Sequence, residues 1–147
     1  MKKLLLALPI FAVSAAACSQ NLTPQNVPSV VQNGLKVRFA DATGLEWEKA
    51  GDNYEAEFKQ GQNEFEARLS PAGQVITLKQ DIALTELPAA ISNTISAQFK
   101  DYKIDDTERV ENGGQVYYQV ELEKRFSGKK LVFSPEGQVA ANIAFWD

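Results

Sequence analysis

The chain carries the same short sequence twice, and this duplication constrains its fold more than any other feature. Residues 70–75 read Ser-Pro-Ala-Gly-Gln-Val, and residues 134–139 read Ser-Pro-Glu-Gly-Gln-Val, 64 positions later. The correspondence continues upstream at the same spacing, where residues 54–58 line up with residues 118–122. A fixed spacing between similar segments is typical of a duplicated supersecondary unit. We therefore predict two tandem copies of one small unit.

Each copy is predicted to begin with an amphipathic helix. Apolar residues recur every four positions in both copies: Val27, Val31, Leu35 and Phe39, then Leu87, Ile91, Ile95 and Phe99. This spacing places one apolar stripe on a helix. Pro28 and Pro88 are expected in the first turns, and Thr85 is expected to be the N-cap of the second helix. Gly34 should weaken the first helix by about 1 kcal/mol relative to Ala.

After each helix, apolar and polar residues alternate, which predicts half-buried antiparallel strands. Gly61-Gln62 suits a two-residue hairpin loop, and the resulting register sets Phe58 opposite Phe65. On the other face, this register produces three charged pairs: Lys59 with Glu64, Glu55 with Arg68, and Glu57 with Glu66. The Ser-Pro-x-Gly segments are predicted to form type I turns, and residues 139–145 a closing strand.

A unit of about 60 residues buries too little surface to be stable alone, so the two copies are expected to share one sheet. The predicted fold class is α+β. Each repeat contributes one helix and an antiparallel meander, and both helices pack on one face of a continuous antiparallel sheet. The predicted domain covers residues 27–147, with repeat one at 27–82 and repeat two at 83–147.

The segment before the domain is predicted to direct export. Residues 1–17 combine Lys2-Lys3, an apolar run and a small-residue end, which is typical of a signal peptide. The apolar run is shorter than the roughly 20 residues that a membrane-spanning helix needs. Residues 18–26 are then a lipidated cysteine and a flexible polar spacer.

Cys18 is the only cysteine of the chain, and it follows the predicted signal peptide directly. A lone cysteine cannot form an internal disulfide. Its position favours a bacterial lipoprotein that is held in the cell envelope by the acylated Cys18 and faces the periplasm. Ala15 stands where lipoprotein signals usually have Leu, and ordinary cleavage that leaves a free thiol is the alternative.

The charge of the chain argues against nucleic acid as a partner. Removal of residues 1–17 takes away two lysines and no acids, so the net charge changes from −4 to −6. Nucleic-acid binding needs clustered Lys and Arg to neutralise phosphates. A basic protein is the better expectation, and the membrane is expected to be contacted only through the lipid anchor.

The sequence offers no catalytic constellation. It contains no histidine, which excludes a Ser-His-Asp triad and imidazole ligands for zinc. No cofactor motif is present, and the protein is predicted not to be an enzyme. Asp52-Asn53 and Asp105-Asp106 could offer oxygens to calcium, but they lack the EF-hand spacing and are interpreted as turn residues. No metal site is therefore predicted.

Several segments resemble the PepSY-like, beta-lactamase-inhibitor-like family of bacterial envelope proteins. They lie at residues 46–49, 51–58, 70–73, 117–122 and 134–137. The resemblance covers residues 27–147 and implies helices packed on one face of an antiparallel sheet, as in a protein inhibitor of beta-lactamase. It transfers no catalytic residue. Thr107 stands where the alignment of the repeats puts Trp47, so the two halves need not share one binding role.

Two groups of residues are candidates for binding. The first is a set of acidic residues on the predicted solvent face of the strands: Glu46, Glu48, Glu55, Glu57, Glu64, Glu66, Glu121 and Glu123. A basic partner could dock there, or the face could simply be solvated. The second is a set of aromatic residues, Tyr117, Phe126 and Trp146, which suit an interface or pack between the repeats.

These observations predict a non-catalytic envelope lipoprotein that binds a protein, and inhibition or regulation of an envelope enzyme is one form that such binding could take. The alternative is an envelope protein that binds a small ligand or a metal ion.

Overall fold

The computed structural model describes residues 20–147, and the predicted signal peptide and Cys18 lie outside them. Within this range the strands are β1 (Gln20–Leu22), β2 (Thr43–Ala50), β3 (Asn53–Gln60), β4 (Asn63–Leu69), β5 (Val75–Asp81), β6 (Lys103–Asn112), β7 (Gln115–Lys124) and β8 (Ser127–Phe133). The helices are α1 (Ser29–Arg38) and α2 (Ala89–Gln98), each preceded by a single 3-10 turn, η1 (Pro24–Asn26) or η2 (Leu84–Glu86).

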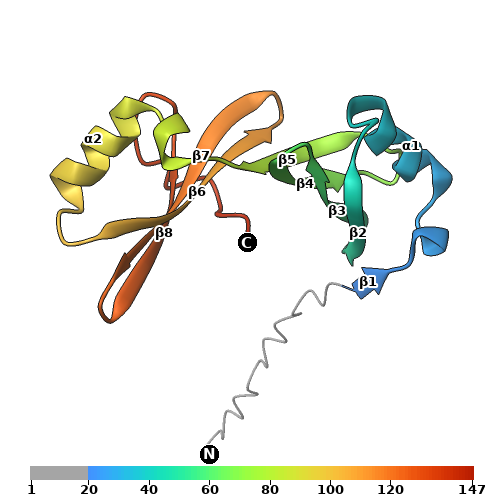
Figure 1. Ribbon diagram of the computed structural model, residues 1–147, viewed down its shortest axis with the longest axis horizontal. Coiled ribbons are helices and arrows are strands. Elements are labelled where there is room, and N and C mark those ends of the chain that lie inside the picture. Colours follow the sequence, from blue (N-terminus) through green and yellow to red (C-terminus); the bar gives the residue numbers. More distant parts are fainter. Residues whose placement is uncertain (1–19) are drawn as a thin grey trace, which may run out of the picture.

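All eight strands form one antiparallel sheet whose spatial order follows the chain from β1 to β8. Figure 1 shows that the sheet is arched and that α1 and α2 lie at its opposite ends. Pairing of β5 with β6 joins the two repeats into one sheet. The predicted α+β class, with tandem units and a continuous sheet, is therefore confirmed.

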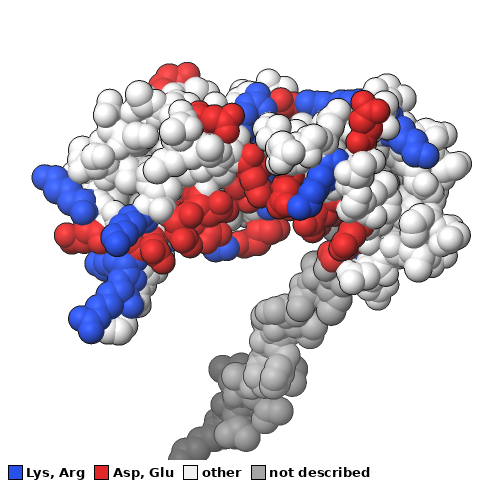
Figure 2. All heavy atoms as spheres, viewed as in Figure 1, with Lys and Arg blue, Asp and Glu red and all other residues white. Residues whose placement is uncertain are grey.

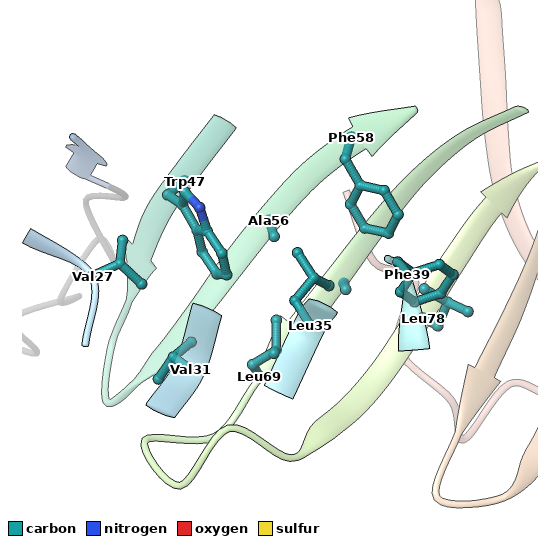
Figure 3. Close-up of a cluster of buried hydrophobic side chains, with 10 residues drawn as sticks. Val27, Val31, Leu35, Phe39, Trp47, Ala56, Phe58, Leu69 and Leu78 are labelled. Carbon is teal, nitrogen blue, oxygen red and sulfur yellow. The ribbon is translucent and has the colours of Figure 1, made fainter. Parts of the chain in front are cut away.

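Each helix covers its own hydrophobic cluster. Under α1, Val31 and Leu35 pack with buried residues of β2 to β5, among them Trp47 and Phe58 (Figure 3). Under α2, a second cluster joins Ile91 and Ile95 to buried residues of β7 and β8. Both clusters lie within residues 27–133. We therefore expect a chain that begins at residue 19 to fold by itself.

The helices are shorter than the predicted apolar stripes, and their starts differ from the prediction. Pro28 and Pro88 are the N-cap residues of α1 and α2 instead of members of the first turn. Thr85 is not the N-cap of α2, because it lies within η2, one turn earlier. There the side chain of Glu86 accepts a hydrogen bond from the backbone N–H of Ala83 at 2.8 Å. None of the helices in the described part of the chain could cross a bilayer.

The predicted register of the β3–β4 hairpin is confirmed. Phe58 lies opposite Phe65, and Glu57 lies opposite Glu66. The position of the turn and the alternation of the side chains settle this register, because a slip by one residue would turn every apolar side chain to solvent.

The predicted closing strand at residues 139–145 is wrong. The segment makes one bridge to β8, between Phe133 and Val139, and then leaves the sheet edge. A ninth strand would have a neighbour on one side only, whereas the folded-back segment buries the ring of Trp146, which is 9% exposed. We call residues 140–147 the C-terminal segment.

In both repeats, the Ser-Pro-x-Gly turn packs directly against the helix. A Cβ at Gly34 would lie 2.7 Å from the carbonyl carbon of Gly73 and closer still to its oxygen. In the second repeat, Thr94 takes the place of Gly34, and its hydroxyl donates to the carbonyl oxygen of Gly137 at 2.8 Å. The same helix-to-turn contact is thus made by close backbone approach in one repeat and by a hydrogen bond in the other.

Candidate functional site

The sheet face opposite the helices carries a cluster of glutamates. Because Trp47, Ala56 and Ala67 point toward α1, the residues that alternate with them point away from it. This places five side chains on the opposite face, which we call the acidic face: Glu46, Glu48, Glu55, Glu57 and Glu66. Figure 2 shows acidic side chains gathered along the underside of the arch.

The register brings these carboxylates directly opposite one another. Glu46 pairs with Glu57, Glu48 with Glu55, and Glu57 with Glu66. Like charges in opposing positions destabilise an antiparallel pair. The arrangement therefore works against the stability of the sheet.

The acidic face lines a cleft of about 600 Å³. Its other walls come from β1, η1, further residues of β2 and the end of the described chain: Asn21, Leu22, Thr23, Pro24, Leu45, Trp47 and Asp147. The lining contains no lysine and no arginine. The cleft therefore offers concentrated negative charge beside a small apolar wall.

Only part of this charge is neutralised by neighbouring cations. Arg68 donates to Glu55, with 2.7 Å between Nε and Oε1, and Lys79 Nζ lies 2.8 Å from Glu66 Oε2. Within residues 20–147, Glu46, Glu48 and Glu57 form no salt bridge. These three carboxylates remain free to meet an external cation.

Lys79 stands at the centre of a half-buried network on the same face. Its Nζ also lies 3.3 Å from Glu108 Oε1, and Gln119 Nε2 donates to Glu108 Oε2 at 2.6 Å. Burial raises the pKa of Glu66 and of Glu108, although Lys79 opposes both shifts. Burial would lower the pKa of Lys79, but the two glutamates hold it above the usual value.

The C-terminal segment lies over this network. The amide side chain of Gln119 bonds the backbone of Trp146 twice, accepting from its N–H at 2.7 Å and donating to its carbonyl at 2.9 Å. The guanidinium of Arg68 lies 4.8 Å from the centre of the indole ring, and Lys79 Nζ lies 5.2 Å from it. The side-chain amide of Gln119 thus makes the two hydrogen bonds to the backbone of Trp146 that a neighbouring strand would otherwise make.

The structure brings two of the three predicted aromatic residues together. Trp146, which is buried over the network, and half-buried Tyr117 both line a second cleft of about 390 Å³. Phe126 stands apart at the tip of the β7–β8 hairpin and is 89% exposed. Of the remaining acidic candidates, Glu64 pairs with Lys59, and Glu121 lies 3.1 Å from Lys130 Nζ.

The described residues contain no group of three His, Cys, Asp or Glu side chains placed to hold a metal ion. Lys79, Glu108 and Gln119 are not among the residues predicted from the sequence. Lys79 and Gln119 have apolar neighbours whose alternation indicates their face, whereas Glu108 lies between Thr107 and Arg109 and lacks this signal. Their burial, however, depends on the return of the C-terminal segment, for which the sequence gives no local signal.

The raised pKa values of Glu66 and Glu108 make a testable prediction. In mildly acidic solution the folded protein binds protons at these two groups more readily than the unfolded chain does. Their contribution to the unfolding free energy therefore falls as the pH rises from the usual carboxyl pKa of 4.5 through the raised values. The double variant Glu66→Gln, Glu108→Gln should lose this negative slope in denaturation measured across that range.

Glu111 provides a control, because its effect on the pH dependence of the unfolding free energy has the opposite sign. Hydrogen bonds from Arg38 and then Arg109 hold the pKa of Glu111 below its usual value. Its stabilising contribution is therefore present above the usual carboxyl pKa and is lost as the pH falls through the lowered value. Glu111→Gln should remove a positive slope, and a change of the same sign in both variants would contradict the assignment.

Comparison with known proteins places this architecture in a family. A family model described as "Putative beta-lactamase-inhibitor-like, PepSY-like" matches twice, at residues 16–77 and 75–141. No curated protein matches the chain. The family is described by likeness to an inhibitor and not by a reaction, in keeping with a non-catalytic protein.

Solved structures share the fold. A "putative periplasmic" protein from Bacteroides eggerthii is 24% identical, with a TM-score of 0.73, and the match covers 78% of this chain and 86% of that one. A "BLIP-like" protein from Bacteroides fragilis is 22% identical, with a TM-score of 0.66. That match covers 76% of this chain and 82% of the other. The two matches of the family model span most of the sequence, so the chain belongs to the PepSY-like, beta-lactamase-inhibitor-like family.

Proposed function

We propose that this protein is a non-catalytic lipoprotein of the cell envelope that binds a partner protein through its acidic face. The partner presents a basic surface, and the binding inhibits or regulates an envelope enzyme. The signal peptide would occupy residues 1–17, the lipidated Cys18 and the predicted spacer residues 18–26, and the binding domain residues 27–147. The spacer is not flexible throughout, however, because β1 pairs with β2, and β1 and η1 both contribute to the wall of the cleft.

The observation that carries the proposal is the set of three carboxylates that have no salt bridge in the described residues. Glu46 lies directly opposite Glu57, and Glu48 lies two residues farther along the strand of Glu46, so the sheet bears the repulsion between these charges. A cationic surface placed over them would relieve that repulsion and be steered to the cleft by its field. The description of the family as inhibitor-like and the periplasmic description of one structural relative support an exported binding protein.

Affinity capture tests the proposal. Tagged protein is crosslinked in its own cell envelope, and the captured proteins are identified by mass spectrometry. The test variant carries Glu46→Gln, Glu48→Gln and Glu57→Gln, which removes three charges and breaks no salt bridge within residues 20–147. The control removes three charges from exposed turns, through Asp41→Asn, Asp52→Asn and Glu136→Gln.

The partner should be captured by the wild type and by the control and lost from the test variant. With the purified partner, the test variant should associate about tenfold more slowly at low salt, at the lower end of what electrostatic steering provides. A partner held equally by all three proteins would refute docking on the acidic face.

The lipid anchor is tested separately. Cells grown with a palmitate analogue should label the wild-type protein, and Cys18→Ser should abolish the label, because the acyl chains need the thiol and the new N-terminus of that residue. A wild-type protein without label would refute lipidation while leaving the binding proposal intact.

A small ligand or metal ion in the cleft is the second candidate function. The volume of about 600 Å³ favours a small ligand, whereas the described residues offer no group of three ligating side chains for a metal ion. Trp47 lines the cleft, and Trp146 lies over the adjoining network. Titration with calcium should then change the tryptophan fluorescence, and no response at millimolar calcium would exclude calcium as the ligand.

A further inference from the structure

The tip of the β7–β8 hairpin exposes a large apolar side chain that the acidic face does not use. Phe126 is 89% exposed and belongs to neither hydrophobic cluster. The guanidinium of Arg125 lies 5.1 Å from the centre of its ring. An exposed aromatic ring beside a cation costs solubility and contributes nothing to the core.

Positive side chains gather at this end of the sheet. We call Phe126 and four cations on the β7–β8 hairpin and the adjoining start of β6 the basic tip: Lys103, Lys124, Arg125 and Lys129. Lys103, Lys124 and Arg125 line a cleft of about 450 Å³ together with Asp101 and Glu123. Despite these two acids, none of the four cations forms a salt bridge within the described residues. The cluster keeps a positive excess in a chain whose net charge is −4.

The basic tip projects from the body of the molecule. Figure 1 shows the β7–β8 hairpin extending below the arch, on the side where β1 begins the described chain. Figure 2 shows positive side chains along that projection and acidic side chains nearer the middle of the molecule. A flat surface that met this side would therefore touch the tip before it approached the acidic face.

We propose that the basic tip docks on an anionic lipid surface. Aromatic rings with a cationic surround suit the membrane interface, where the ring enters the boundary of the acyl chains and the cations meet lipid phosphates. Each Lys or Arg close to an anionic bilayer adds about 1 kcal/mol of attraction, or about fivefold in affinity. The repulsion of the acidic face is screened beyond about 8 Å at physiological salt.

This inference rests neither on the acidic face nor on the anchor at Cys18, so it is tested without acyl chains. The protein is the chain from residue 19 to residue 147, which contains both hydrophobic clusters. Its partitioning is measured by co-sedimentation with vesicles of phosphatidylcholine and phosphatidylglycerol, and with vesicles of phosphatidylcholine alone.

Helix α1 offers a matched control for the basic tip. The test variant is Arg125→Glu, Phe126→Ser. The control is Lys36→Glu, Val37→Ser, which makes the same kind of change at an exposed cation beside an apolar residue that is 88% exposed. Both pairs lie outside the cores, so both variants should unfold as the wild type does.

We expect salt-sensitive binding to the phosphatidylglycerol vesicles, reduced at least about fivefold by the test variant and unchanged by the control. In addition, Phe126→Trp should shift its emission to shorter wavelength when those vesicles are added. The proposal is overturned by no binding to anionic vesicles, by equal binding to phosphatidylcholine alone, or by equal losses in both variants. An absence of binding to anionic vesicles would instead favour an acidic protein as the partner of the basic tip.

Discussion

Replacement of Gly34 by Ala is expected to destabilise the protein by about 3 kcal/mol, the upper end of the usual cost of overpacking. Helix propensity alone predicts the opposite, a gain of about 1 kcal/mol. The helix gain is outweighed because the new methyl group would meet the backbone of Gly73, which cannot rotate aside as a side chain does. Helix and turn would have to separate, which would open the cluster under α1.

The measurement is the unfolding free energy from urea denaturation. Asn33→Ala is the control, because Asn33 is an exposed residue of the same helix and should show the ordinary propensity gain of about 0.5 kcal/mol. Opposite signs for the two substitutions would establish the close approach of α1 to the Ser-Pro-x-Gly turn. A stabilised Gly34→Ala variant would place the helix farther from the turn.

Replacement of Phe58 by Ala should cost about 3–5 kcal/mol, the range for a fully buried aromatic ring. Phe58 is 1% exposed, and its ring centre lies 4.8 Å from that of Phe39 and 5.5 Å from that of Phe65. The cavity would remove both ring contacts from the centre of the first cluster. Because a domain is stable by only about 5–15 kcal/mol, this one change should take a large share of the total.

Trp47 lies in the same cluster, so its fluorescence reports the transition directly. Phe126→Ala makes the same chemical change at the exposed hairpin tip and should alter the unfolding free energy by no more than about 0.5 kcal/mol. Equal costs at the two positions would show that the first cluster is not packed as described.

Most of the sheet could be predicted from the sequence because its information is local. Strict alternation assigns each side chain of β3 and β4 to a face, and the turn at Gly61 then sets their register. The shared face of Glu46, Glu55 and Glu57 follows from the same alternation, and so does the pair of Glu55 with Arg68. These features need no knowledge of distant parts of the chain.

What could not be predicted depends on distant contacts. Residues 139–145 alternate as well as other strands do, but the segment leaves the edge of β8, and Trp146 bonds the distant side chain of Gln119 instead. Thr85 is a suitable cap in isolation, yet Pro88 sets the start of α2. The sequence likewise gives no sign that Gly34 faces a turn nearly 40 positions away.

The agreement between strand order and chain order has a consequence for how the protein is made. Every strand pairs with the one that precedes it, so no strand must wait for a distant segment before it can join the sheet. Such local pairing lowers the entropy lost in closing loops and favours fast folding for a β-rich protein. A chain delivered N-terminus first could complete the cluster under α1 and then extend the sheet strand by strand. The last strand of the partly formed sheet would then offer its free backbone groups to the next strand of the chain.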